Sequence, residues 1–219
     1  MEDTYRHKGL RRKMVDNLRQ LGVASEDVLK AMGEIPRHMF IDSVFDSQAY
    51  MEKAFSIGNG QTISRPSTVA QQSTLLEVFP GSKVLEVGTG SGYQAYVLEQ
   101  LGADVYSIER QKFLYLKTKD LLASLRSRVK CFYGDGYQGL AEFAPYDRIL
   151  VTCGSASWPA DLFSQLKVGG IMVLPYGSPK QVMTKIVRKD ETNVGVTFHG
   201  DCHFVPMLPD RIGENFHVV

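Results

Sequence analysis

A glycine-rich segment, residues 83–93, contains the residue types that point most directly to chemistry. An apolar run from Lys83 to Val87 is followed by three glycines that alternate with hydroxyl residues. We expect a buried strand, a turn and then a helix from about Ser91 to Leu101. Glycines allow positive φ and close approach of the backbone to a ligand, and the helix start adds free N–H groups. The residues expected to contact this ligand are Gly88, Thr89, Gly90 and Gly92.

The spacing of the glycines and one acid indicate which ligand it is. The G-x-G-x-G order differs from the G-x-G-x-x-G of dinucleotide-binding turns, and Glu86 at the strand end points towards the turn. A carboxylate suits a cation better than a pyrophosphate. S-adenosylmethionine (SAM) is an adenosine without phosphates that carries an ammonium and a sulfonium. We therefore predict a SAM site, with a tight turn that binds nothing as the alternative.

Two further acids follow expected strands. Glu109 ends the alternating run from Asp104, about twenty residues after the first glycine, where an acid can bridge the hydroxyls of a ribose. Asp135 and Gly136 follow the run from Cys131 to Tyr133. Asp135 is placed to accept a hydrogen bond from the exocyclic amine of an adenine, or to hold its own turn through its side chain. The sequence leaves both roles open.

Length and composition limit the classes of function. The chain has 219 residues and a formal net charge of +1, with acidic and basic residues interspersed, so no surface for nucleic acid is indicated. There is no apolar leader and no apolar run near the roughly eighteen residues of a membrane span. Three separated cysteines suggest neither disulfides nor a zinc site. We expect a reduced, cytoplasmic protein without membrane or nucleic-acid partners.

The order of elements predicts the fold class. Strands are expected near residues 83–87, 104–109, 129–133, 147–152 and 170–174, with helices between them. This alternation is typical of an α/β fold with a doubly wound, mostly parallel sheet. The chain then becomes β-rich, with runs at 182–188, 194–198 and 203–205.

The first eighty residues read instead as a helical cap with a substrate loop. Leu10, Met14, Leu18 and Leu21 recur at helical spacing before Gly22, and Ser25 can cap a second helix that stops at Ile35-Pro36. No Pro/Ser-rich linker separates these helices from the sheet. We therefore expect one domain over residues 1–219, in which residues 1–80 are an integrated part and residues 81–219 form the SAM-binding sheet and the C-terminal strands.

The segment from Ile57 to Pro66 fits no ordinary scaffold role. It contains two glycines, then Thr62 and Ser64, then a proline that can open a helix running to about Val78. In one interpretation the hydroxyls and N–H groups at this helix start bind a substrate carboxylate. In the other, Ser64 only caps the helix.

Together these segments resemble the protein-L-isoaspartate O-methyltransferases over nearly the whole chain. The glycine turn is shared by SAM-dependent methyltransferases in general, so the resemblance implies a sheet of the Rossmann-like SAM-dependent methyltransferase type. Two segments are much more specific to this family: the Gly-Gln-Thr-Ile-Ser loop that ends at Ser64, and the Phe-Val-Pro segment from Phe204 to Pro206. The likeness extends to residues 35–40, 58–66, 84–94, 107–110, 134–139, 146–152 and 204–207.

The resemblance implies an activity and roles for individual residues. The activity is SAM-dependent methylation of the free α-carboxylate of L-isoaspartyl residues in damaged proteins, which starts repair through a succinimide. Ser64 matches the active-site serine, Thr62 lies in the same substrate loop, and the backbone around Val205 helps to hold the peptide. Glu86 with the glycine turn, Glu109 and Asp135 would bind SAM. The alternative is a SAM-dependent methyltransferase for another carboxylate or a small molecule.

The implied reaction matches the residue inventory. A carboxylate is ionised at neutral pH and a sulfonium is a reactive donor, so neither a general base nor a metal is required, and no metal-ligand spacing is evident. Rate enhancement would come from alignment and partial desolvation. Arg65, where the family commonly has glutamine, either adds charge near the substrate carboxylate or faces solvent. Trp158, in an unusual turn from Cys153 to Pro159, is either a lid or a staple on the next helix.

Overall fold

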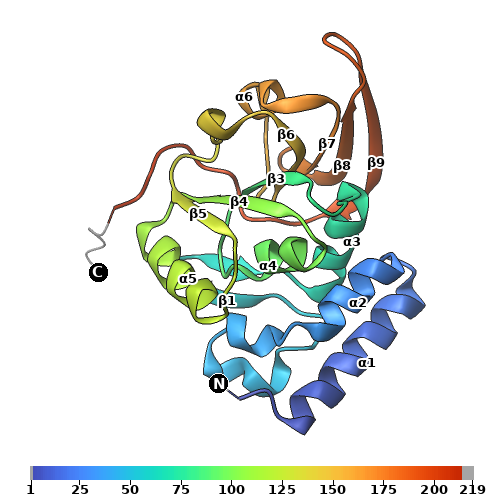
Figure 1. Cartoon of the computed structure of the whole chain (residues 1–219), viewed down its shortest axis with the longest axis vertical. Helices are drawn as coiled ribbons and strands as arrows, with labels where there is room; N and C mark the ends of the chain where they lie inside the picture. The colour runs from blue at the N-terminus through green and yellow to red at the C-terminus, as the bar shows by residue number, and fades with distance from the viewer. Residues whose placement is uncertain (1, 214–219) are drawn as a thin grey trace.

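A seven-stranded sheet organises the computed structural model, which describes residues 2–213 (Figure 1). Its strands lie in the order β5-β4-β3-β6-β7-β8-β9. The first five strands in this order are parallel to one another, and β8 runs antiparallel to both β7 and β9. The strands are β3 (Lys83–Val87), β4 (Asp104–Glu109), β5 (Lys130–Tyr133), β6 (Tyr146–Val151), β7 (Leu166–Tyr176), β8 (Gln181–Arg188) and β9 (Val194–Cys202). The predicted α/β fold with a mostly parallel sheet is confirmed, as is its β-rich end.

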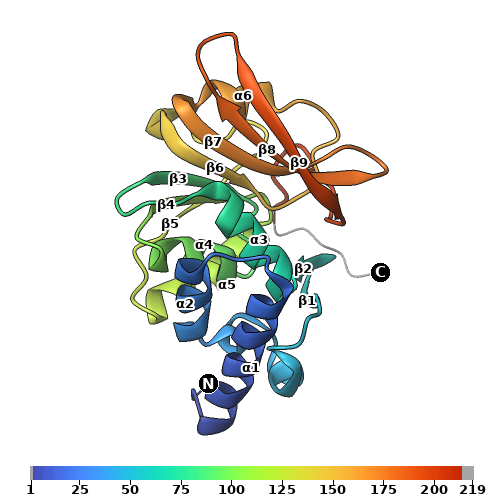
Figure 2. The ribbon, with the colours of Figure 1, turned by 90° about the vertical axis from the view of Figure 1, so that its right-hand side faces the viewer.

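Helices cover both faces of the sheet because its central strands are apolar on both sides. In β3, Val84 packs with the side chains of α3 (Pro66–Leu76) and α4 (Tyr93–Gln100). Leu85 points to the opposite face, where it shares a core with Leu162 of α6 (Ala160–Ser164). Figure 2 shows α3, α4 and α5 (Lys112–Ser124) on one side of the sheet and α6 on the other.

The predicted helical cap is present and packs beyond α3–α5, on the side away from the sheet (Figure 2). It contains α1 (Tyr5–Leu21), α2 (Glu26–Glu34) and the short helices η1 (Arg37–Phe40) and η2 (Ser43–Gln48). Its core continues into Val97 of α4 and Leu114 of α5. Gly22 ends α1 in the left-handed conformation, as expected. This continuity supports an integrated cap, while the division of the chain into domains stays a prediction.

Two local predictions were wrong. The segment expected as a loop from Ile57 forms part of a hairpin, β1 (Phe55–Gly58) and β2 (Gln61–Ile63), whose turn residues Asn59 and Gly60 both have positive φ. Asn-Gly is a preferred pair for such a turn. The strand expected at residues 203–205 is absent, because the chain leaves the sheet after β9 and crosses its edge, making isolated bridges to Gly154 and Gln111.

The helices described in residues 2–213 include none that is both long enough and apolar enough to cross a membrane.

Candidate active site

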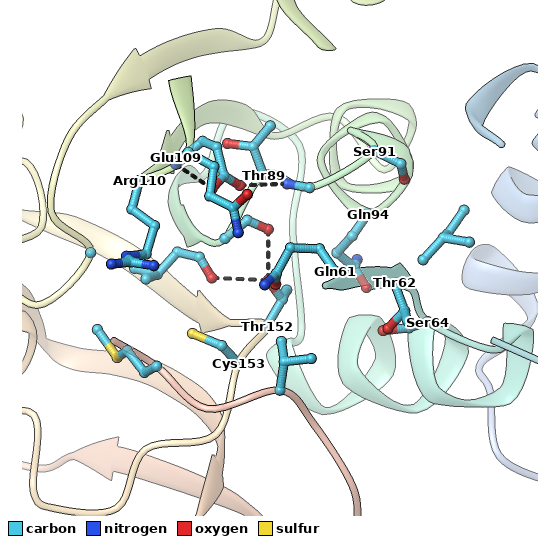
Figure 3. Close-up of a pocket in the computed structure, with 18 of the residues that line it drawn as sticks. Gln61, Thr62, Ser64, Thr89, Ser91, Gln94, Glu109, Arg110, Thr152 and Cys153 are labelled. Carbon is cyan, nitrogen blue, oxygen red and sulfur yellow. Dashed lines mark hydrogen bonds between the residues drawn. The ribbon is translucent and has the colours of Figure 1, made fainter. Parts of the chain in front are cut away.

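A pocket opens at the edge of the sheet where β3, β4 and β6 end (Figure 3). Parallel strands place their carboxyl ends together, and here the chain also changes direction of winding, which is where ligands bind in such sheets. The hairpin strand β2 and residues 205–208 close the other sides. The pocket has a volume of about 900 Å3, its open mouth included. Of the predicted site residues, it is lined by Thr62, Ser64, Gly88, Thr89, Gly90, Glu109, Gly136 and Val205.

The turn after β3 is built for close backbone approach. Gly88 has a φ of 100°, and a Cβ added there would lie 2.5 Å from Oγ1 of Thr152. That hydroxyl donates to the carbonyls of Val87 and Gly88 at 2.9 and 2.7 Å and so ties the turn to the end of β6. A side chain at position 88 would therefore break the turn as well as fill the pocket. The requirement for glycine predicted at this position is explained by these contacts.

Glu109 lies at the end of β4 with only 5% of its surface exposed. Its carboxylate accepts hydrogen bonds from the N–H groups of Gly90 and Gln111, both at 2.9 Å. Burial raises the pKa of Glu109, and these bonds oppose the rise. The acid thus braces the glycine turn and faces the pocket at the same time, which fits the predicted role at a ribose diol.

Glu86 does not line the pocket, in contrast to the expectation that it points towards the turn. Successive strand residues face opposite sides of the sheet, so Val87 reaches the pocket and Glu86 is buried beneath the turn. Its Oε2 accepts a 2.5 Å hydrogen bond from Ser107, whose hydroxyl is 2.6 Å from that of Thr89, while Oε1 has no partner. Burial raises the pKa of Glu86 to about 8. Glu86 can therefore support the turn from below without touching a ligand.

Two other predicted cofactor residues also lie outside the pocket lining. The carboxylate of Asp135 accepts from the N–H groups of Tyr137 and Asp210, so it holds its own turn, the second of the two roles that the sequence left open. Gly92 starts α4 with a φ of 83°, and a Cβ there would be 2.7 Å from a methyl group of Thr118. Glycine at this position therefore allows the start of α4 to pack closely against α5, which contains Thr118.

Ser64 and Thr62 face the pocket from the hairpin and the loop after it (Figure 3). The capping interpretation of Ser64 is wrong: the N-cap of α3 is Arg65, and no side chain caps this helix by a hydrogen bond at that position. The Ser64 hydroxyl bonds to nothing among residues 2–213. It is therefore available to a ligand.

The helix start cannot supply the N–H groups expected for a substrate carboxylate. Pro66 has no N–H, and the N–H of Ser67 donates to Glu52 at 3.0 Å. The Ser67 hydroxyl donates to the same carboxylate. Arg65 turns away from the pocket to Glu52 at 3.6 Å and Thr68 at 3.1 Å. Of the predicted groups at this site, the hydroxyls of Thr62 and Ser64 remain.

The backbone around Val205 is partly engaged. Its carbonyl accepts from the N–H of Gly154 at 2.8 Å, and the N–H of Met207 donates to the Gly154 carbonyl. The N–H of Val205 has no partner within the described chain, so one donor at the pocket wall is open.

Trp158 packs on Phe163 of α6 with ring centroids 5.2 Å apart. It is absent from the pocket lining, so of its two predicted roles the structure supports the staple on the next helix.

Several lining residues were not singled out from the sequence. They include Gln61, Gln72, Gln94, Arg110, Thr152 and Cys153. Gln94 follows the glycine turn directly, and this position is the sequence signal that could have identified it as a site residue. Its Oε1 is buried without a partner. Burial raises the pKa of the Cys153 thiol to about 12, which leaves it a poor nucleophile. Gln72 reaches the pocket only through the packing of α3 on β6.

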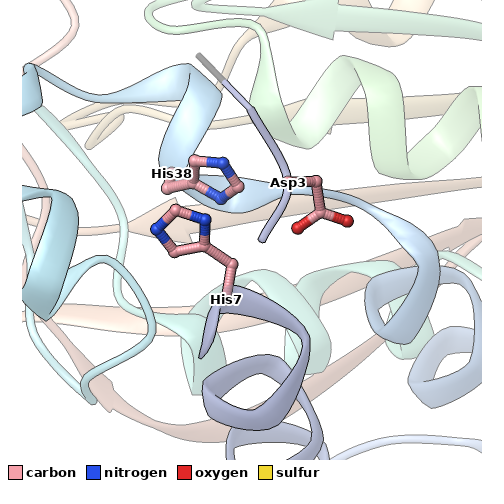
Figure 4. A group of neighbouring side chains, drawn as sticks. All are labelled: Asp3, His7 and His38. Atoms are coloured by element: carbon pink, nitrogen blue, oxygen red, sulfur yellow. The ribbon is translucent and has the colours of Figure 1, made fainter. Parts of the chain in front are cut away.

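The cap holds a second group of polar side chains, Asp3, His7 and His38 (Figure 4). The rings of His7 and His38 are stacked with centroids 3.8 Å apart, so their in-plane lone pairs run side by side and do not meet at one ion. Asp3 is paired with Arg11 and His7 with Asp46, both at 3.0 Å. These contacts make the group part of the packing of the cap. No spacing in the sequence indicated that these separated histidines meet.

Comparison with known proteins agrees with this geometry. The family model described as Protein-L-isoaspartate(D-aspartate) O-methyltransferase (PCMT) matches residues 9–211. A protein-L-isoaspartate O-methyltransferase of Christiangramia forsetii is 54% identical over 212 residues, which are 96% of this chain and all of that one. One of Flavobacterium psychrophilum is 51% identical with the same coverage.

Solved structures show the same fold. A protein-L-isoaspartate O-methyltransferase superposes with a TM-score of 0.81 at 31% identity, covering 90% of this chain and 65% of that chain. A structure titled a putative protein-L-isoaspartate O-methyltransferase of Plasmodium falciparum, in complex with S-adenosyl-L-homocysteine, superposes with a TM-score of 0.79 at 23% identity, covering 90% and 98%. With the pocket, the glycine turn and these matches together, the chain belongs to the protein-L-isoaspartate O-methyltransferase family.

Proposed function

We propose that this chain transfers a methyl group from SAM to the free α-carboxylate of L-isoaspartyl residues in damaged proteins. The observation that carries the proposal is the composition of the pocket that contains both Glu109 and Ser64. One side is a glycine-rich backbone turn, braced by a buried acid. The other side presents the unbonded hydroxyl of Ser64 beside Thr62.

The first side suits SAM. Gly88, Thr89 and Gly90 offer a surface on which an adenosine and a charged amino-acid tail can lie without steric conflict, and Glu109 has lone pairs left after its two backbone bonds. Bound there, SAM would supply an electrophilic methyl group on a sulfonium. Glu86 braces this side from beneath, and the side chain of Asp135 is not needed in contact with the ligand.

The second side suits a carboxylate acceptor. The Ser64 hydroxyl donates one hydrogen bond to the acceptor and thereby selects the oxygen that faces the methyl group. Since the acceptor is already ionised, Ser64 orients it and removes no proton, and the proposed reaction requires neither a general base nor a metal. The open N–H of Val205 can pair with the peptide backbone that carries the isoaspartyl residue.

The partners follow from the same proposal: isoaspartyl proteins and peptides, with no role for nucleic acid or membranes. Burial raises the pKa of all three free thiols, to about 12 for Cys131 and Cys153 and about 11 for Cys202. Such thiols are weak nucleophiles. Three cysteines without a disulfide suit a reducing compartment, so we place the reaction in the cytoplasm.

The direct test uses labelled SAM and two peptides that differ only in carrying L-isoaspartate or L-aspartate at one position. We expect base-labile methyl ester on the isoaspartyl peptide and little on its partner. Similar rates on both peptides would instead identify a general carboxyl methyltransferase, and no ester on either would contradict the proposed function.

A further inference from the structure

Arg37 is a fully buried cation directly behind the acceptor side of the pocket. It is the first residue of η1 in the cap, and none of its surface is exposed. Its Nε donates to the carbonyl of Ala49 at 2.8 Å, and its Nη2 donates to the carbonyl of Ser64 at 2.6 Å. The guanidinium therefore joins the cap to the residue proposed to orient the acceptor.

The charge of Arg37 has no ion-pair partner within residues 2–213. Its Nη1 is buried and makes no hydrogen bond. The guanidinium carbon lies 4.7 Å from the ring centroid of Tyr93, a residue that lines the pocket. A cation over an aromatic face is stabilised, but a cation–π contact replaces only part of the hydration that burial removes.

Burial lowers the pKa of Arg37, which is the expected sign for a cation held away from water. A guanidinium nevertheless stays charged at neutral pH. The fall in pKa is opposed most by Tyr93 and less by the charge of Glu52. Glu52 lies outside ion-pair range and is already bonded to Ser67 and paired with Arg65. The folded protein thus keeps a positive charge behind Ser64 and Tyr93 that no ion pair within residues 2–213 neutralises.

We infer that Arg37 is a positioning residue for the acceptor: it fixes Ser64 through its carbonyl, and its charge favours a carboxylate at the pocket face of Ser64. The inference rests on the proposed function. It explains how the pocket attracts a carboxylate, which the start of α3 does not explain. The N–H groups of α3 are blocked or occupied, so Arg37 is the cation placed to attract an anion there. A buried charge acts through low dielectric and is poorly screened.

The test compares an isoaspartyl peptide with its α-carboxamide analogue, which has the same shape without the charge. Binding of both is measured by calorimetry in the presence of S-adenosylhomocysteine. We expect the wild-type protein to bind the carboxylate more tightly than the carboxamide. Arg37→Gln keeps hydrogen-bond donors without the charge, and in this variant the ratio of the two affinities should fall about tenfold. Arg37→Lys, which keeps the charge and loses the fork, should retain the preference and bind both peptides more weakly.

The matched control is Arg65→Gln, which removes a cation next to Ser64 that faces away from the pocket. It should leave the preference within about twofold of wild type. A purely structural role for Arg37 would weaken both peptides equally in Arg37→Gln, and that result would overturn the inference. So would an Arg37→Lys variant that loses the preference, a criterion that decides the question even where Arg37→Gln does not fold.

Failure of the inference can be told from failure of the proposed function. Wild-type protein that does not methylate the isoaspartyl peptide contradicts the function itself. Wild-type protein that methylates it, together with an Arg37→Gln variant that keeps the full carboxylate preference, contradicts only the role of Arg37.

Discussion

The two sides of the pocket are built in different ways. The cofactor side is a short, continuous turn whose shape is set by backbone conformation and by bonds to the adjacent strand, such as Gly90 to Glu109. The acceptor side is assembled from segments distant in sequence, with Ser64 held by Arg37 of the cap and Ser67 by Glu52. A binding surface made of backbone tolerates no added atoms, whereas one made of side chains depends on its supports.

The largest effect is expected from an added methyl group on the cofactor side. Gly88→Ala would place Cβ 2.5 Å from the Thr152 hydroxyl at a φ of 100°, so the turn must move and SAM binding should fall by more than about 100-fold. Gly60→Ala in the acceptor hairpin is the control, because nothing lies within 4 Å of its Cβ. It should cost only the roughly 1–2 kcal/mol of a left-handed residue.

Calorimetry with S-adenosylhomocysteine and melting temperatures, measured on both glycine variants, test this pair. A Gly88→Ala protein with wild-type affinity would show that the turn is not the cofactor surface.

Removing Glu109, which braces the turn, should give the next largest effect. This effect should be confined to cofactor binding. Glu109→Ala deletes a carboxylate that holds two backbone N–H groups and faces the pocket. Bonds to charged groups contribute about 1.5–3 kcal/mol, so SAM affinity should fall about ten- to a hundred-fold. Affinity for the isoaspartyl peptide should change much less. Unchanged SAM affinity would remove Glu109 from the cofactor site.

Ser64→Ala should give the converse result on the acceptor side. Losing one bond to a carboxylate slows methyl transfer by about ten- to a hundred-fold, while SAM affinity and melting temperature stay near wild type, because the hydroxyl supports nothing in the fold. Single-turnover rates on the isoaspartyl peptide measure it. Ser67→Ala, which loses a structural bond to Glu52, is the control and should lower stability more than rate. A Ser64→Ala enzyme with the wild-type rate would contradict the proposed role.

The smallest expected effect concerns pH and the acid beneath the turn. Burial raises the pKa of Glu86 from 4.5 to about 8 in the folded protein, so folding favours its protonated form. Its contribution to the free energy of unfolding is complete below pH 4.5 and is lost as pH rises to about 8. Glu86→Gln mimics the neutral acid and should flatten this decline, which urea unfolding across that range would reveal. An identical decline in both proteins would contradict the assignment.

Sequence patterns predicted the cofactor side better than the acceptor side for the same physical reason. The glycine turn and Glu109 belong to local strand–turn–helix geometry, so residue spacing contains most of the information. The orientation of Glu86 was the exception, because the pattern marks a strand end but the alternation of faces decides where a side chain goes. For Asp135 the pattern allowed two roles, and a contact 75 residues away, to Asp210, engages its second oxygen.

On the acceptor side, Ser64 and Thr62 were identified, but the groups that position them were not. The hydrogen bonds of Arg37 and Glu52 join residues between 12 and 27 positions apart, and no periodicity encodes them. The hairpin was expected as a loop although Asn59-Gly60 is a preferred turn pair. Its strands are only four and three residues long, too short for alternation to stand out.

The crossing of residues 203–213 over the edge of the sheet has a consequence for the order in which the enzyme becomes competent during synthesis. Val205 to Leu208 form one wall of the pocket, and Arg110 fastens the segment through the carbonyls of Pro209 and Asp210. A chain emerging from the ribosome completes the strands and the glycine turn long before this wall exists. Nascent protein can therefore fold most of its sheet, but it gains a closed binding site only once translation has passed residue 208.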